Sequence, residues 1–304
     1  MDHKSFIASL SDEDRRSLHQ RSDINGLLHL AVHLSAIAAS ATLIASDLPG
    51  TMAATLPLGI LLVFLFTLQH ECVHETPFRT VWLNRLIGAV CGFVLINPNL
   101  WFRYFHLAHH RHTHDPTRDP ELATPKPQTV GDYLIYLSGL PYWFAATKTL
   151  ILLVLGSFRA EHLPANARAR VIAAARWQFL FYVAVAACSF WFRSDLLVFL
   201  WIIPVLIGQP FLRVYLLAEH TLCPHVSNML ENTRTTFTNQ LVRFLAWNMP
   251  YHAEHHAMPM VPFHRLPALH EKLREHLKQT EPGYAAFHSK MYKRVSSDPP
   301  QPNT

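Results

Sequence analysis

The stretch MAATLPLGILLVFLFTLQHECVH, residues 52–74, indicates which kind of fold this chain adopts. Met52–Gln69 is almost entirely apolar, and about 20 residues of that kind cross the hydrocarbon core of a bilayer. The stretch then ends in His70 and His74. Residues four apart share a face of a helix, so both imidazoles can point to one place. The stretch therefore predicts a membrane-spanning helix that ends in two candidate metal ligands.

Three more apolar runs have the length of a membrane span. They are Leu27–Ser46, Ile172–Phe192 and Leu196–Ala218. Short polar turns, DLPG at 47–50 and RSD at 193–195, join the four runs in pairs. Half of the 304 residues are hydrophobic and only 15% are charged, which is typical of a helical membrane protein. We predict an all-α integral membrane protein whose four transmembrane helices form two hairpins.

Two further apolar stretches, Val81–Leu100 and Tyr133–Gly156, suit a span less well. The first ends in the polar segment Asn97-Pro-Asn99, and the second is broken by SGLP at 138–141. We expect interfacial or re-entrant helices there. With four crossings, all histidine-rich segments fall on one side of the membrane. Loops on that side are rich in arginine, and basic loops face the cytoplasm. We therefore expect a multi-pass protein of the cell membrane with a cytoplasmic histidine-rich cap and both termini in the cytoplasm.

The chain divides into three predicted parts. Residues 1–26 form a polar cytoplasmic segment, 27–292 form the membrane domain, and 293–304 form a disordered tail. The N-terminus lacks a basic start followed by an apolar core, so no cleaved signal peptide is expected. The net charge of +5 suggests basic loops beside an anionic membrane surface, and no nucleic-acid partner is expected.

Two further histidine clusters have the spacing HxxHH. They are His106, His109 and His110, and then His252, His255 and His256. An isolated His220 ends the last apolar run. Helical i, i+3 and i+4 spacing puts the imidazoles of each cluster on one face, and neutral imidazole binds zinc, copper, iron and nickel. Together with His70 and His74 these residues fit two metals with four or five ligands each.

Other functions fit the histidines less well. Residues 70–74 also read His-Glu-x-x-His, the signature of zinc metalloproteases. A single zinc site would leave the other two clusters without a purpose. A metal transporter would place its ligands near the middle of the membrane, whereas these follow the ends of apolar runs. A role stays open for five more histidines: His29, His33, His112, His114 and His225.

Carboxylates and aromatic residues flank the clusters. Carboxylates can accept the outer imidazole N–H bonds and so orient the rings, with plain surface charge as the alternative. The main candidates are Glu71, Asp115, Glu219 and Glu254, and Glu75 and Asp119 belong to the same set. Trp101, Tyr104, Trp247 and Tyr251 precede the second and third clusters. These aromatic residues either anchor the protein at the interface or line a tunnel for an extended substrate chain.

The HxxxH and the two HxxHH clusters, in this order and with His220 after the last span, resemble the three histidine boxes of the membrane fatty acid desaturase superfamily. That superfamily includes lipid hydroxylases and carotenoid ketolases and hydroxylases. The resemblance covers roughly residues 30–270, and residues 232–259 are similar to bacterial members. It implies a non-haem di-iron centre with two iron ions, dioxygen as the oxidant, and a separate ferredoxin- or cytochrome-type electron donor. One position differs from the pattern of some acyl-CoA desaturases. Those enzymes have an asparagine where this chain has Leu216.

We therefore expect an oxidoreductase that activates dioxygen to desaturate a lipid acyl chain. Removal of two hydrogens gives an alkene, whereas return of a hydroxyl group after the first removal gives an alcohol. Both outcomes use the same ligands. A hydroxylase or ketolase acting on a lipid or carotenoid is the alternative function.

Overall fold

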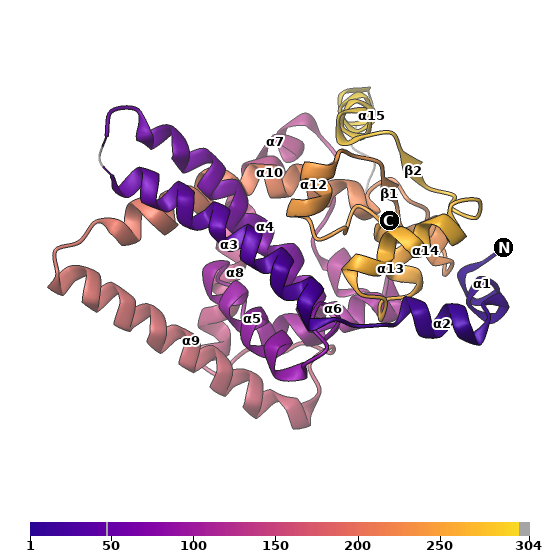
Figure 1. The fold of residues 1–304 in the computed structure, drawn as a ribbon, viewed down its shortest axis with the longest axis horizontal. Helices are drawn as coiled ribbons and strands as arrows, with labels where there is room; N and C mark the ends of the chain where they lie inside the picture. The colour runs from indigo at the N-terminus through magenta and orange to yellow at the C-terminus, as the bar shows by residue number, and fades with distance from the viewer. Residues whose placement is uncertain (47, 298–304) are drawn as a thin grey trace.

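The structure is a computed structural model that describes residues 1–46 and 48–297. Helices dominate the described part (Figure 1). The α-helices are α1 (His3–Ser9), α2 (Asp12–Leu18), α3 (Asp23–Ala45), α4 (Thr55–Val73), α5 (Val81–Val94), α6 (Asn99–His112), α7 (Val130–Ser138), α8 (Leu140–Val154), α9 (Ala165–Trp191), α10 (Ile203–His220), α11 (Met229–Asn232), α12 (Gln240–Leu245), α13 (His252–Ala257), α14 (Leu266–Leu273) and α15 (Tyr284–Ser297). The other elements are the 3-10 turns η1 (Thr51–Ala54), η2 (Pro120–Ala123) and η4 (Phe263–Arg265), the π-helix η3 (Val198–Ile202), and the strands β1 (Thr235–Thr236) and β2 (Thr280–Glu281).

Four helices are long and apolar enough to cross a membrane. They are α3, α4 with η1 before it, α9, and α10 with η3 before it, and they cover nearly all of the four apolar runs of the sequence. The prediction of a helical protein with four such helices is confirmed. The first of them begins where Ser22 accepts a hydrogen bond from the Asn25 backbone N–H at 3.2 Å, so a side-chain cap separates the polar segment from the apolar run.

The two remaining apolar stretches form bent helix pairs. Helices α5 and α6 meet at an angle of 101°, and α7 and α8 meet at 58°. The second bend is at Gly139, whose φ of +74° is a left-handed conformation that glycine adopts without strain. By length and composition, each pair could also form one broken span. The interfacial or re-entrant position of both pairs therefore stays a prediction.

Helices α4 and α10 form the centre of the molecule. A Cβ on Gly59 of α4 would lie 2.2 Å from the Pro204 carbonyl oxygen, and a Cβ on Gly208 of α10 would lie 2.3 Å from the Gly59 backbone. The two backbones are therefore in direct contact, as small residues permit between membrane helices. The number of residues from Gly59 to His70 in α4 nearly equals the number from Gly208 to His220 in α10. The two helices therefore carry both histidines to the same end of the molecule.

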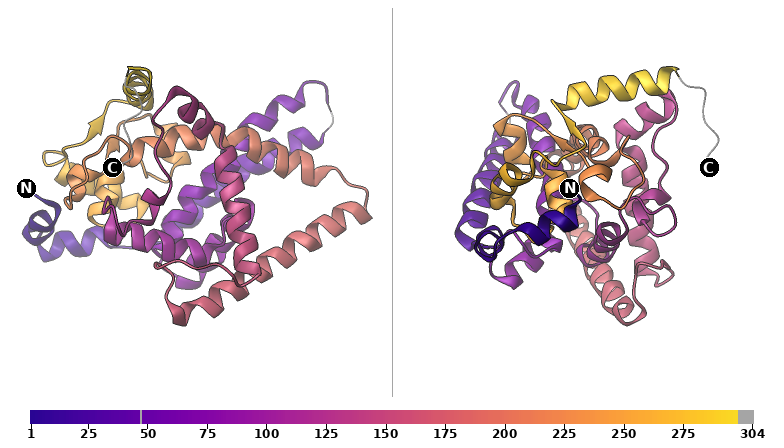
Figure 2. Two further views of the ribbon diagram at one scale, coloured as in Figure 1. Left: turned by 180° about the vertical axis from the view of Figure 1, so that it is seen from behind. Right: turned by 90° about the vertical axis from the view of Figure 1, so that its right-hand side faces the viewer.

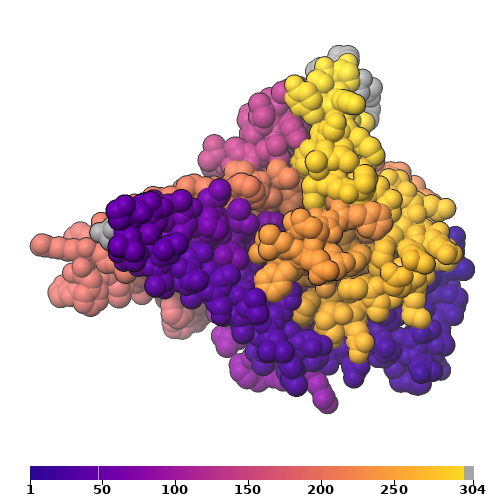
Figure 3. Space-filling model, turned by 45° about the horizontal axis from the view of Figure 1, so that its top comes forward, coloured from indigo at the N-terminus to yellow at the C-terminus, as the bar shows by residue number. Residues whose placement is uncertain are grey.

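The segments from α11 onward gather at this histidine end, as the views from the front and the back show (Figures 1 and 2). Strand β1 precedes α13 and pairs in parallel with β2, which follows α14. Helices α1 and α2 pack against the same region, where Lys272 Nζ lies 2.8 Å from Asp14 Oδ1. In the space-filling view the indigo N-terminal residues lie beside the yellow C-terminal ones (Figure 3). The two ends of the described chain therefore build one cap over the histidines.

Two regions lie at the periphery. Helix α9 runs along the edge of the molecule and buries only Ala167, Val171 and Ala175 (Figure 2). Helix α15 continues to Ser297, so residues 293–297 are helical, in contrast to the disordered tail expected from residue 293. Residues 298–304 of that expected tail lie outside the described part of the chain.

Candidate metal centre

Four separate elements bring the nine predicted ligand histidines together. His70 lies in the last turn of α4 and His74 caps that helix, the second cluster lies in α6, His220 ends α10, and the third cluster lies in α13. All nine side chains are buried. Burial of this many imidazoles at one place is unusual, because each has a donor and an acceptor that need partners.

The nitrogen atoms form two groups. In the first group, the possible ligand atoms of five histidines lie within 4.8 Å of one another: His70, His74, His106, His110 and His255. In the second group, those of His109, His220 and His256 do so. His252 joins the second group, because its Nε2 lies 3.1 Å from His220 Nε2. The structure thus divides the nine histidines into five and four.

The Nε2 atoms face one another across each group. His106 Nε2 lies 2.9 Å from both His74 Nε2 and His110 Nε2, and His109 Nε2 lies 3.2 Å from His220 Nε2. Two facing imidazole nitrogens can share only one proton, and His70 has no partner at either ring nitrogen. Buried acceptors left in this way are costly unless a cation lies between them. The arrangement fits a pair of metal ions bound by the two groups.

The surroundings of the first group favour neutral rings. Burial lowers the pKa of His74 to about 3, with a further contribution from the positive charge of Arg103. Burial also lowers the pKa of His106, His110 and His255 well below the usual value. These imidazoles are therefore neutral at neutral pH, which is the form that binds metals.

Asp119 holds the outer nitrogen of one ligand. His109 Nδ1 donates to Asp119 Oδ1 at 2.9 Å, and the other carboxylate oxygen accepts from the His114 backbone N–H at 2.8 Å. Burial acts to lower the pKa of His109, but the negative charges of Glu121 and Asp119 outweigh it and the pKa is raised. A carboxylate at Nδ1 fixes the tautomer that leaves Nε2 free for a metal.

Two more predicted carboxylates lie beside ligand rings. Glu219 Oε1 lies 3.5 Å from His252 Nδ1, and Glu71 Oε1 lies 3.7 Å from His255 Nδ1. Glu71 is fully buried, and its other oxygen accepts hydrogen bonds from Thr76 Oγ1 and from the Phe263 backbone N–H, both at 3.0 Å. Glu71 therefore connects Thr76 with the turn η4. This role differs from that of a general base, which the pattern His-Glu-x-x-His would give it.

Two supporting groups were missed at the level of sequence. Thr113 Oγ1 donates to the His109 carbonyl at 2.8 Å and lies 3.3 Å from His256 Nδ1. The Asn232 carbonyl oxygen lies 3.3 Å from His220 Nδ1. Thr113 follows the second cluster closely, which could have drawn attention to it, whereas a backbone carbonyl such as that of Asn232 leaves no signal in the sequence.

Three of the predicted carboxylates contact other partners, and one of them, Glu75, pairs with Arg85. Asp115 accepts from Thr117 and Arg118 at the surface, because the turn after α6 directs it away from the rings. Glu254 is buried on the opposite side of α13 and accepts from Thr235 Oγ1 at 2.5 Å and from His270 Nδ1. Glu254 thus ties α13 to β1 and α14. His270, which has no cluster spacing in the sequence, is part of this tie.

The five histidines left open have separate positions. His29 Nε2 and His33 Nε2 contact the carbonyl oxygens of Phe244 and Leu61 at 2.8 and 2.9 Å, so they do not form a metal pair. The rings of His114 and His225 lie 4.8 Å apart between centroids, and His114 also lies beside His220. His112, the last residue of α6, is in neither of the two groups of ligand nitrogens.

The four aromatic candidates for a tunnel lie in packed surroundings. Trp101 packs against Phe105, Phe158 and His162, and Tyr104 belongs to the same apolar cluster. Trp247 is fully buried, and Tyr251 Oη accepts from Arg243 Nη1 at 2.6 Å. Trp101 and Tyr104 lie on α6, which carries the second cluster, and Trp247 and Tyr251 lie just before α13, which carries the third. Their role toward a substrate stays a prediction.

A comparison with protein families identifies the chain. The model of the family described as fatty acid desaturase matches residues 48–288, which is most of the sequence. The chain belongs to the fatty acid desaturase family. This membership confirms the resemblance of the three histidine clusters to desaturase boxes. It also removes the support for a zinc protease.

Individual desaturases are similar over much of the chain. A dihydrorhizobitoxine desaturase from Bradyrhizobium elkanii is 26% identical over 248 residues, covering 75% of this chain and 69% of that protein. An sn-1 oleoyl-lipid 12-desaturase from Synechocystis is 24% identical over 237 residues, covering 71% of this chain and 66% of that protein. An sn-1 acyl-lipid omega-3 desaturase (ferredoxin) from Nostoc is 27% identical over 94 residues, 28% of this chain and 26% of that protein.

Proposed function

We propose that this member of the desaturase family is a membrane di-iron oxygenase that uses dioxygen to desaturate the acyl chain of a lipid. The observation that carries the proposal is the pair of buried groups in which histidine nitrogens from four elements face one another. Five histidines in one group and four in the other match the ligand numbers expected for two iron ions. His70, His74, His106, His110 and His255 would hold one iron, and His109, His220, His252 and His256 the other.

Iron bound at both groups would supply the redox chemistry that activates dioxygen for attack on an unactivated C–H bond. The side chains of the protein hold the rings in place. Asp119, Thr113 and the Asn232 carbonyl hold the outer nitrogens of three rings of the second group, those of His109, His256 and His220. On the side of the first group, Glu71 Oε1 lies 3.7 Å from His255 Nδ1. In the overall reaction, two adjacent methylene groups each lose one hydrogen. With two electrons and two protons from outside the chain, these hydrogens reduce one dioxygen to two waters.

The relatives support a lipid substrate and an external donor. Two of them are named for lipid acyl chains, and one name includes ferredoxin. We therefore propose a separate electron donor of ferredoxin or cytochrome type. We also propose the cell membrane as location, with the histidine-rich cap in the cytoplasm. The four long apolar helices and the arginine-rich loops on the histidine side support this location.

The decisive experiment is mass spectrometry of total lipids from cells that express the chain and from control cells. Desaturation yields products lighter by two hydrogens, and hydroxylation yields products heavier by one oxygen. The second result would establish the alternative function of a lipid hydroxylase. A ketolase acting on a carotenoid would leave the acyl chains unchanged and alter the pigment.

The metal content tests the centre itself. The purified protein should contain close to two irons per chain. His110→Ala should lower that content and abolish product formation, because the remaining rings on α6 cannot shift by a helical turn to replace the lost ligand. His276→Ala is the matched control, because His276 contacts Phe6 in the outer part of the cap and should leave both unchanged. One zinc per chain in the wild-type protein would contradict the proposal.

A further inference from the structure

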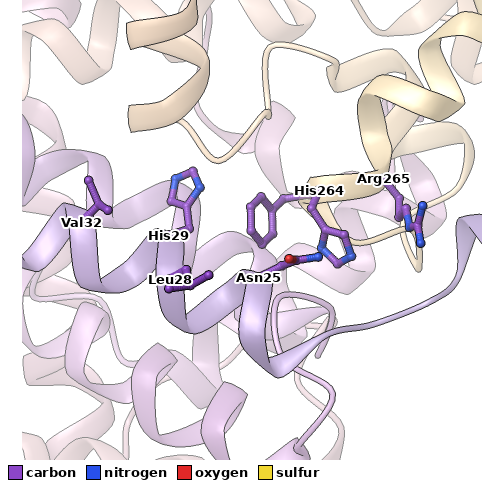
Figure 4. A pocket seen from close by; sticks show the side chains of 7 residues that line it. Asn25, Leu28, His29, Val32, His264 and Arg265 are labelled. Carbon is purple, nitrogen blue, oxygen red and sulfur yellow. The ribbon is translucent and has the colours of Figure 1, made fainter.

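An open pocket of about 530 Å³ lies outside the histidine centre, between the first turns of α3 and the turn η4 (Figure 4). It is lined by Asn25, Leu28, His29, Val32, Phe263, His264 and Arg265. In the close-up view, Leu28 and Val32 lie along α3, while His264 and Arg265 lie toward the other end. The pocket therefore has an apolar end and a polar end.

The apolar end faces the membrane. Leu28 and Val32 are 63% and 57% exposed, and they lie one turn apart on a helix long and apolar enough to span a bilayer. Asn25, in the first turn of that helix, marks its boundary with the polar N-terminal segment. Exposed aliphatic side chains on a membrane-spanning helix are suited to contact lipid chains, and Leu28 and Val32 are left exposed by residues 1–46 and 48–297. In the membrane arrangement proposed above, the pocket thus extends across the boundary between water and hydrocarbon.

The polar end carries one positive charge. Arg265 Nη2 donates to Gln20 Oε1 at 2.6 Å, and within residues 1–46 and 48–297 Arg265 forms no ion pair. None of the lining residues is acidic. His264 contacts the Gln20 carbonyl oxygen at 3.2 Å, and burial lowers its pKa, so it is neutral at neutral pH. The charge of the pocket therefore comes from the Arg265 guanidinium.

We propose that this pocket binds an anionic phospholipid, with the lipid phosphate at Arg265 and Asn25 and one acyl chain along Leu28 and Val32. A guanidinium at the membrane surface favours phosphate through charge and through paired N–H donors. The Arg265 guanidinium matches the lipid phosphate, and the exposed aliphatic side chains of Leu28 and Val32 match an acyl chain. The site goes beyond the proposed function, because it requires neither iron nor any reaction.

The position of the pocket connects the lipid with the histidine centre. Phe263 forms part of the pocket wall, and its backbone N–H donates to Glu71, the carboxylate beside His255. A lipid that holds η4 in place would therefore also hold this carboxylate. Lipid binding is a property of the apoprotein as well, so it can be measured apart from activity.

Native mass spectrometry of the purified full chain in mild detergent tests the proposal. The probes are phosphatidylglycerol and phosphatidylcholine with the same acyl chains, added at equal concentrations. The wild-type protein should retain phosphatidylglycerol in preference to phosphatidylcholine. Arg265→Gln should weaken this retention about tenfold or more, the effect of losing one charged hydrogen-bonding partner. Arg265→Lys should keep most of it, and Arg16→Gln, a change at an exposed arginine in α2, should have no effect.

A second variant separates lipid binding from folding. Leu28→Trp fills the apolar end while leaving Arg265 and the cap unchanged, and it should also weaken retention of phosphatidylglycerol. Equal retention of both lipids, or unchanged retention by either Arg265→Gln or Leu28→Trp, would overturn the proposal. Displacement of phosphatidylglycerol by glycerol 3-phosphate, which has the phosphate and no chains, would identify a site for free phosphate and would overturn it as well. Oleate is the corresponding probe for a site that recognises a carboxylate, and preferential retention of oleate would also overturn it.

Discussion

At the scale of single residues, two aspartates in the turn after α6 have opposite positions. Asp119 lies ten residues after His109 and is nevertheless bonded to its ring, because the turn that begins at Thr113 folds back on the helix. His114 takes a positive φ of 62° in that turn, and its backbone N–H donates to the same carboxylate. Asp115 is nearer in sequence but pairs with Arg118 at the surface. The pair offers a matched comparison of a supporting carboxylate with a surface one.

We predict that Asp119→Asn lowers iron affinity or activity by about 10- to 100-fold, as loss of a carboxylate behind a ligand histidine does. The amide keeps the shape of the side chain and loses the charge that holds His109. Asp115→Asn should change neither quantity. Iron per chain and the rate of product formation measure both variants. Wild-type values for Asp119→Asn would show that the His109–Asp119 bond has no role in the centre.

The aromatic residues near the clusters allow a second prediction at this scale. If Trp101 and Tyr251 line a substrate tunnel, Trp101→Ala or Tyr251→Ala should move the position of the new double bond or change the preferred chain length. Iron should remain bound in both variants. The reason is that an apolar wall determines which carbon of an extended chain reaches the metals. Lipid mass spectrometry after chemical derivatisation locates the double bond. Unchanged products with a lower yield of protein would instead indicate interfacial anchoring.

At the scale of elements, the contact between α4 and α10 determines where two of the clusters lie. Gly208→Ala would place a methyl group 2.3 Å from the Gly59 backbone, where a neighbouring side chain cannot yield. We predict that the variant loses about 1–3 kcal/mol of stability, the range found for overpacking, and also loses iron. The loss of iron follows because α4 carries His70 and α10 carries His220. The midpoint of thermal unfolding and the iron content measure the two effects.

Gly131→Ala is the control for this change. A Cβ at Gly131 would lie 3.6 Å from Thr129 Oγ1, an ordinary contact in the first turn of α7. Alanine also has a higher helix propensity than glycine, so this variant should be neutral or slightly stabilised. Equal stability for Gly208→Ala and Gly131→Ala would mean that the two central helices can separate without cost.

At the scale of the whole molecule, the arrangement of the chain in the membrane can be tested directly. We predict that residues 1–26, 101–130 and 221–304 all lie in the cytoplasm. Trp101 of α6 contacts Phe158 and His162 in the loop before α9, which supports placing both segments on the same, histidine-rich side. Reporter fusions at Thr129, Ala165 and the C-terminus should all give a cytoplasmic signal. A signal from the outside at Ala165 would mean that α7 and α8 together form a fifth crossing.

Local patterns in the sequence determined the helices and the ligand types. Four apolar runs predicted the four long helices, because burial in lipid requires continuous apolar length. The spacing of the histidines in each cluster predicted rings on a shared helix face, because the helical repeat depends only on neighbouring residues. The break at SGLP predicted the bend between α7 and α8, where Gly139 takes a positive φ. All of these features depend on interactions within about one helical turn.

Only the tertiary structure decided how the nine histidines divide and what supports them. His255 joins the group of His70, and its neighbour His256 joins that of His220, because the rings of α13 lie against the histidine-bearing ends of both α4 and α10. A turn brings Asp119, and not Asp115, to the ring of His109. The pairing of Glu254 with His270 depends on contact between distant segments. The sequence marks which side chains can bind a metal. Which of them meet depends on helix packing, since packing joins residues far apart in the chain and leaves no periodic pattern along it.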